Sequence, residues 1–266
     1  MSDIVQSSFT NRGSEIHYWK REGSGDSPVL FFHGAGLDHR MFDAQFEVLD
    51  DSYTLVAWDA RGHGQSRLLA GQRFNFDDLL SDVQELYKML GIERAVIVGQ
   101  SMGGNLAQHI AYEYPELVEK LVLIGCTNNA GTLSRVERLS LAMAGPLLRC
   151  MSWTALVNQA VKVISIREDV RAYARECFEL IGKKTFIDTF VSLAASLKPD
   201  PNYRLPVPTL LIVGAKDTSG NILKTANSWA EIDNNITAHI IENAAHNTNQ
   251  DQPEIVNALI KEFLRT

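Results

Sequence analysis

The chain has 266 residues, of which 45% are hydrophobic and 21% are charged, as expected of one globular domain with a large core. Its formal net charge of -7, without clusters of Lys and Arg, argues against a nucleic-acid-binding surface. Cys126, Cys150 and Cys177 have neither disulfide nor zinc-site spacing, so we expect buried core residues in a reducing compartment. Because neither a signal-peptide pattern nor a membrane-length apolar run is present, we expect a cytoplasmic protein that does not bind membranes.

Short apolar runs rich in Val, Ile and Leu alternate with longer helical patterns along most of the chain. Such runs are typical of strands that are buried on both faces of a parallel sheet. The alternation predicts an α/β fold with a mostly parallel, doubly wound sheet flanked by helices. In chain order, we expect strands at 28–32, 53–58, 95–98, 121–124, 209–213 and 238–241, and helices at 41–49, 77–90, 102–114 and 255–264.

One stretch interrupts this rhythm, because residues 128–200 show successive helical patterns and no comparable strand-like run. The simplest interpretation is an inserted helical cap, or lid, that divides the α/β core into residues 1–127 and 201–266. The cap is rich in apolar side chains. Most of them should hold its helices together, whereas some should pack on the core or line a cavity.

A serine stands between an expected strand and an expected helix, in the sequence Gly99-Gln100-Ser101-Met102-Gly103. A tight strand-to-helix turn with flanking glycines is what a nucleophilic serine requires, because it holds the hydroxyl clear of the backbone. The helix N-terminus that follows also favours developing negative charge. We therefore expect Ser101 to be a catalytic nucleophile.

A nucleophilic serine needs a base, and the chain has seven histidines. His246 follows the last expected strand, so it should stand at the carboxyl edge of the sheet, where ligands bind. Asp217 closes the preceding strand segment and can orient the imidazole of His246 as its hydrogen-bond acceptor. The order Ser, Asp, His is that of α/β hydrolases. Asp59 is the rival carboxylate, although its glycine-rich surroundings favour a structural turn.

Backbone amides should stabilise the oxyanion that forms when the serine attacks a carbonyl group. One amide should be that of Met102, directly after the nucleophile. The second should come from the glycine-rich loop after the strand 28–32, where Ala35 is our choice and Gly36 is a close rival. We expect His33 to support this loop by hydrogen bonding.

At this point the sequence resembles the α/β-hydrolase superfamily over nearly the whole chain, and the histidine loop is similar to that of the carboxylesterase and 3-oxoadipate enol-lactonase group. Haloalkane dehalogenases and soluble epoxide hydrolases of this fold use an aspartate nucleophile, whereas Ser101 occupies that position here. Carbon–carbon bond hydrolases commonly place a tryptophan after the catalytic histidine, and this chain has Asn247. The features that carry the resemblance are the His33-Gly34 loop, the 59–66 turn, the 99–103 turn, and the pair Asp217 and His246.

The resemblance implies a serine hydrolase that cleaves a small to medium carboxylic ester through an acyl-enzyme intermediate, without a metal or an organic cofactor. A lactone is an alternative small-molecule substrate. An alternative of another class is a hydrolase-like receptor that binds a ligand and turns it over slowly. The sequence leaves the oligomeric state and the physiological substrate open.

Overall fold

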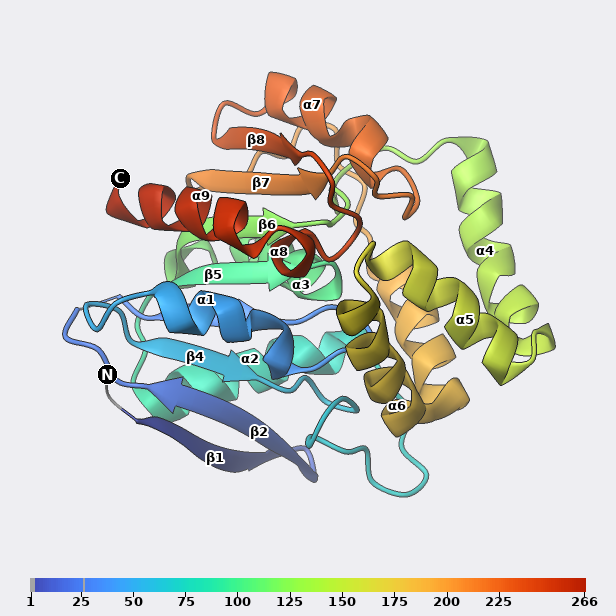
Figure 1. Cartoon of the computed structure of the whole chain (residues 1–266), viewed down its shortest axis with the longest axis horizontal. Helices are drawn as coiled ribbons and strands as arrows, with labels where there is room; N and C mark the ends of the chain where they lie inside the picture. Colours follow the sequence, from blue (N-terminus) through green and yellow to red (C-terminus); the bar gives the residue numbers. More distant parts are fainter. Residues whose placement is uncertain (1–2, 26) are drawn as a thin grey trace.

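An eight-stranded sheet organises the protein in the computed structural model, which describes residues 3–25 and 27–266 (Figure 1). The spatial order is β1-β2-β4-β3-β5-β6-β7-β8. Strands β3 to β8 run parallel to one another, while β2 pairs antiparallel with both β1 and β4. The strands are β1 (Ile4–Asn11), β2 (Ser14–Arg21), β3 (Val29–Phe32), β4 (Leu55–Trp58), β5 (Ala95–Gln100), β6 (Val118–Ile124), β7 (Thr209–Gly214) and β8 (Ile236–Ile241).

Helices cover both faces of the sheet, and the central strands are consequently apolar on both sides. In β3, Leu30 and Phe32 point into one buried cluster, and Val29 and Phe31 point into the other. Residues of α2, α3 and α7 contribute to the first cluster and residues of α1 and α9 to the second. The helices are α1 (Asp43–Val48), α2 (Phe76–Leu90), α3 (Met102–Glu113), α4 (Arg135–Cys150), α5 (Trp153–Ile164), α6 (Glu168–Ala195), α7 (Ile222–Ile232), α8 (Thr248–Asp251) and α9 (Pro253–Arg265), with short 3₁₀ helices η1 (His39–Phe42) and η2 (Pro115–Leu117).

The predicted α/β architecture and its six strands are confirmed, and their bounds differ by no more than a few residues. The hairpin of β1 and β2 was missed because its strands are largely polar and lie at the open edge of the sheet, outside the buried-strand pattern. A tight turn joins the two strands, with Arg12 and Gly13 both at positive φ. Helices α7 and α8 were also not predicted.

Three helices, α4, α5 and α6, separate β6 from β7 along the chain. Figure 1 shows them beyond the arrowheads of the parallel strands, at the carboxyl edge of the sheet. Ser134 caps α4 in a reciprocal capping box with Glu137, and Ser152 caps α5. A left-handed residue, Gly182, kinks α6 at φ 73°. This helical segment (residues 135–195) therefore lies beside the end of the sheet where the predicted site residues are found.

The expectation that all three cysteines are buried is wrong for one of them. Cys126 and Cys177 are buried, but Cys150 is exposed at the end of α4. Only one face of α4 contacts the rest of the protein, so the apolar pattern of this helix did not indicate burial. Within the described residues, no helix is both long and apolar enough to cross a bilayer.

Candidate active site

Ser101 lies in the sharp turn between β5 and α3, with φ 49° and ψ -114°. A non-glycine residue rarely adopts a positive φ, and such conformations are concentrated at functional sites. Both glycines of the motif are required sterically. A Cβ atom on Gly99 would lie 2.4 Å from the carbonyl oxygen of Gly103, and one on Gly103 would lie 1.9 Å from that of Phe32. The glycines therefore let α3 approach the strands closely enough to form the turn.

His246 and Asp217 form a hydrogen-bonded pair, with 2.9 Å between Nδ1 of the imidazole and Oδ2 of the carboxylate. The Asp217 side chain is fully buried, whereas that of His246 is 12% exposed. The loop after β6 brings the pair toward the serine turn: the Ser101 amide donates to Ile124, and the next residue, Gly125, packs on both members of the pair. Ser101 and the Asp217–His246 pair therefore lie at the same edge of the sheet, on segments joined through Ile124 and Gly125.

The environment of Asp217 keeps its carboxylate ionised. Burial alone would raise the pKa of Asp217, but the hydrogen bond and the charge of His246 outweigh it, together with hydrogen bonds from Ser219, and the pKa falls below its ordinary value. The amide of Ser219 donates to Oδ1 at 2.7 Å, while Oδ2 accepts from His246. An ionised acceptor on Nδ1 leaves the other imidazole nitrogen, Nε2, free to act as a base.

The predicted oxyanion residues lie on two adjoining segments. Met102 begins α3, and Ala35 lies in the glycine-rich loop after β3, where a Cβ on Gly34 would be 3.4 Å from the Cβ of Ser101. Within the described chain, the amides of Ala35, Gly36 and Met102 donate no hydrogen bond to the protein. All three amides are therefore available to an acceptor, and the choice between Ala35 and Gly36 stays open.

His33 supports this loop by two hydrogen bonds, as expected. The amide of Ala60 donates to Nε2 at 2.8 Å, so the proton is on Nδ1, which donates to the Gly34 carbonyl oxygen at 2.8 Å. Burial lowers the pKa of His33, which keeps the ring neutral in this arrangement. The ring thus joins the glycine-rich loop to the end of β4.

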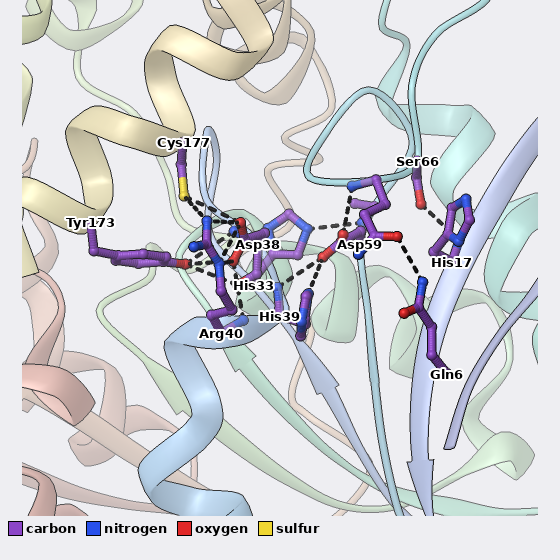
Figure 2. A network of polar contacts seen from close by, with 12 residues as sticks. Gln6, His17, His33, Asp38, His39, Arg40, Asp59, Ser66, Tyr173 and Cys177 are labelled. Atoms are coloured by element: carbon purple, nitrogen blue, oxygen red, sulfur yellow. Dashed lines mark hydrogen bonds and ion pairs between the residues drawn. The ribbon is translucent and has the colours of Figure 1, made fainter. Parts of the chain in front are cut away.

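Asp59 belongs to a different network and does not compete with Asp217 for His246. Its Oδ1 accepts from the amide and Nδ1 of His39, and its Oδ2 accepts from the amide of Gln65 at 2.7 Å (Figure 2). A Cβ on Gly64 would lie 2.1 Å from Asp59, so the glycine in this turn lets the chain wrap around the carboxylate. The interpretation of Asp59 as a structural residue agrees with these contacts.

A nearby group of oxygen and nitrogen atoms from Asp38, His39 and Asp59 lies within 4.8 Å, close enough for a metal ion. Their ligand atoms are already used by hydrogen-bond donors. Arg40 binds both carboxylate oxygens of Asp38, and His39 donates to Asp59. Because a guanidinium group already neutralises Asp38, this group of residues is better described as a hydrogen-bonding network than as a metal centre.

Contacts from the helical segment to the candidate site were not predicted. The amide of Asn247, directly after His246, donates to Ile164 at the end of α5 at 2.7 Å. On α6, Tyr173 and Cys177 contact Asp38 at the end of the glycine-rich loop (Figure 2). The sequence signalled only that some apolar cap residues should reach the core, and no motif marks these polar partners.

The comparisons with known proteins place the chain in a family. The family profile described as "Serine aminopeptidase, S33" (Hydrolase_4) matches residues 23–253, so the chain belongs to this family of α/β hydrolases. A curated relative, "Epoxide hydrolase 1" of Caenorhabditis elegans, is 29% identical over 94% of this chain and 67% of its own length.

Two solved structures confirm the α/β-hydrolase fold. A thermophilic esterase from Thermogutta terrifontis has a TM-score of 0.78 and 24% identity, over 99% of this chain and 98% of its own. The enol-lactonase from Burkholderia xenovorans LB400 has a TM-score of 0.77 and 22% identity, over 98% of this chain and 100% of its own. At these identities the likeness establishes the fold alone. The family match over residues 23–253 and this fold together identify the protein as an α/β hydrolase.

Proposed function

We propose that this protein is a serine hydrolase that cleaves small to medium carboxylic esters through an acyl-enzyme intermediate. Ser101 is the nucleophile, His246 the general base and Asp217 the residue that orients the imidazole. The observation that carries the proposal is the 2.9 Å bond between His246 and Asp217 at the edge of the sheet where Ser101 adopts a positive φ.

The reaction has two steps. His246 takes the proton of Ser101 as the serine oxygen attacks the ester carbonyl, and the amides of Ala35 and Met102 hold the oxyanion. The imidazolium of His246 then gives this proton to the departing alkoxide, which leaves as the alcohol when the acyl C–O bond breaks. Water then attacks the acyl-enzyme with His246 again as base, which releases the acid and restores Ser101. A lactone is a cyclic ester, so the same groups would open it without losing an alcohol fragment.

An epoxide hydrolase activity, as named for the C. elegans relative, has less support. Soluble epoxide hydrolases of this fold open the ring with an aspartate nucleophile, whereas the corresponding turn here carries the hydroxyl of Ser101. Ester cleavage instead uses a serine nucleophile, which the turn provides as Ser101, together with the pair Asp217 and His246.

We further propose that residues 128–200 form a cap over this site. The contact of Asn247 with Ile164 and the contacts of α6 with Asp38 support this view, because they join the helical segment to both loops of the site. Phe178 and Phe186 of α6 pack against Gly36, and the apolar composition of the cap favours a substrate with an apolar acyl or alcohol part.

The test is the rate of hydrolysis of p-nitrophenyl esters, from acetate to octanoate, by wild type, Ser101→Ala and the matched control Ser228→Ala. Ser228 is exposed on α7 and bonds only within its helix. Many turnovers in wild type and in the control, and none in Ser101→Ala, are expected, with a preference for acyl chains longer than acetate. Activity that survives in Ser101→Ala would overturn the mechanism.

Further substrates separate the remaining alternatives. Aminoacyl p-nitroanilides test the peptidase activity for which the family is named, and simple lactones test ring opening. A receptor would give slow or single turnover on every substrate but a ligand-dependent thermal shift, whereas an enzyme cycles many times on at least one ester.

A further inference from the structure

The glycine-rich loop between β3 and η1 is held at both ends by side chains. At its start, His33 binds the Gly34 carbonyl oxygen, and the amide of Leu37 closes a turn onto the same oxygen at 3.1 Å. At its end, Asp38 is 3% exposed and caps η1 by accepting from the amide of Arg40. The amides of Ala35 and Gly36 lie between these two anchors.

The second anchor is held by the helical segment. The hydroxyl of Tyr173 accepts from the backbone amide of Asp38 at 3.2 Å and lies 3.1 Å from both its carbonyl oxygen and Oδ1. One turn further along α6, the thiol of Cys177 donates to Oδ2 at 3.3 Å. Figure 2 shows both side chains pointing from α6 toward Asp38. The hydroxyl thus contacts the backbone of the loop directly, as well as its carboxylate.

Charge is balanced within this link. Burial would raise the pKa of Asp38, but the hydrogen bonds and the charge of Arg40 outweigh this effect and bring the pKa below its ordinary value. The carboxylate is therefore ionised. Arg40 also donates to Glu176 of α6 at 3.0 Å, and its guanidinium lies over the Tyr173 ring at 5.2 Å from the centroid. A satisfied buried charge of this kind fixes geometry, since any displacement leaves it unpaired.

Close packing adds to the polar contacts. Gly36 has φ 83°, and a Cβ there would lie 2.5 Å from Cε1 of Phe178. The Phe178 ring is 1% exposed and meets Phe186 edge-on at 4.9 Å between centroids. The backbone of the loop therefore lies directly against an ordered aromatic pair, with no space for the loop to move toward α6.

We propose that the stretch of α6 from Tyr173 to Phe178 positions the oxyanion amides, with Asp38 as the residue that transmits the position of the helix to the loop. This inference rests on the proposed serine hydrolase function. Tyr173 and Asp38 are positioning residues, because they act on the amides of Ala35 and Gly36 rather than on substrate. The position of α6 relative to the glycine-rich loop then determines the rate of the chemical step as well as access to the site.

The effect should fall on kcat. Oxyanion donors work only when they stand about 2.7–3.1 Å from the oxyanion, and loss of one donor costs about 10²–10³ in rate. Loosening the loop costs less than removing a donor. Tyr173→Phe removes the contacts of the hydroxyl with the backbone and carboxylate of Asp38, so it should lower kcat about fivefold and leave KM within about twofold. Asp38→Asn removes a charge and should lower kcat further.

The experiment compares Tyr173→Phe with the matched control Tyr203→Phe. The hydroxyl of Tyr203 is buried without a partner among the described residues, far along the chain from this loop, so its removal breaks no hydrogen bond. Two readouts are taken on the intact protein: kcat and KM on the preferred p-nitrophenyl ester, and hydrogen–deuterium exchange of the peptide covering residues 33–41. Exchange should be about fivefold faster in Tyr173→Phe and unchanged in Tyr203→Phe.

Three results would overturn the inference: unchanged loop exchange in Tyr173→Phe, faster exchange with wild-type kcat, or a change confined to KM. A trifluoromethyl ketone, which forms a hemiketal oxyanion on the serine, should bind more weakly in step with kcat, while the product alcohol should bind as before. Wild type without turnover would instead defeat the proposed function, and the exchange comparison would still decide whether α6 holds the loop.

Discussion

The side chain of Gln100 donates a hydrogen bond from Nε2 to the backbone carbonyl oxygen of His246, at 3.2 Å. The same nitrogen lies 3.2 Å from Oδ1 of Asn247. Gln100 is 1% exposed and directly precedes Ser101, so the serine turn and the histidine loop are joined by one buried amide group. The relative position of nucleophile and base therefore depends on a residue that is neither.

Replacing Gln100 by Met keeps the approximate length of the side chain and removes both donors. We expect kcat on a p-nitrophenyl ester to fall about tenfold or more, because small displacements of catalytic groups are costly. Gln108→Met is the matched control, since Gln108 is buried on α3 and binds Thr127. The control should lose stability but keep kcat per folded molecule. Equal kcat in both variants would show that the link to His246 is dispensable.

Replacing Asp217 by Asn tests the orientation of the imidazole. Asn offers an oxygen of similar shape but no charge, and its amide can hold His246 in the wrong tautomer, so we expect kcat to fall about 10³–10⁴-fold with little change in KM. Asp59→Asn serves for comparison, because Asp59 contacts His39 rather than His246. If Asp59→Asn had the larger effect on kcat after correction for the folded fraction, the assignment of Asp217 would be wrong.

Replacing Gly103 by Ala places a methyl group 1.9 Å from the Phe32 carbonyl oxygen. Backbone atoms cannot rotate away, so α3 must shift, and we expect unfolding free energy to fall by about 3 kcal/mol or more. Gly71→Ala separates collision from backbone strain, since Gly71 has φ 85° and an added Cβ would meet no atom within 4 Å. It should cost about 1–2 kcal/mol. Chemical denaturation of both variants measures the difference, and a mild Gly103→Ala would contradict the close packing of the turn.

The buried parallel strands could be predicted because their burial on both faces leaves continuous apolar runs such as 95–98 and 121–124. Once the strands were placed, chain order put Ser101, Asp217 and His246 beyond strand ends, and the structure brings them to one edge of the sheet. The hairpin of β1 and β2 escaped because an edge hairpin exposed to water needs no such run.

The contacts between the helical segment and the site could not be predicted in the same way. The link from Tyr173 to Asp38 joins residues 135 positions apart, and neither residue belongs to a motif. Only the three-dimensional packing of α6 decides which of its polar side chains face the glycine-rich loop. The exposure of Cys150 has the same origin, since the sequence does not say which face of α4 is covered.

The buried histidines predict how stability depends on pH. Burial, and to a smaller extent the nearby ring of His33 at 5.2 Å between centroids, lower the pKa of His63 to about 3. The unfolded chain binds a proton on this residue near pH 6.5 and the folded chain does not, so the unfolding free energy falls as pH drops from about 6.5 toward 3, by about 1.4 kcal/mol per pH unit for His63. His33 and His109, whose pKa values burial also lowers, add to this slope.

His63→Phe should therefore reduce the slope of unfolding free energy against pH by about 1.4 kcal/mol per pH unit between pH 6 and 5, which corresponds to one proton. This holds whatever its effect on stability at pH 7. Phe can fill the same space, because Nε2 of His63 is buried without a hydrogen-bond partner among the described residues and only Nδ1, near the Arg61 carbonyl oxygen, loses a contact. Urea titrations at several pH values measure the slope. Phe31→Leu is the control, since Phe31 is a buried ring on β3 that carries no titratable proton, so this variant should lose stability and keep the wild-type slope. A wild-type slope in His63→Phe would mean that His63 titrates alike in both states, which its buried position next to His33 argues against.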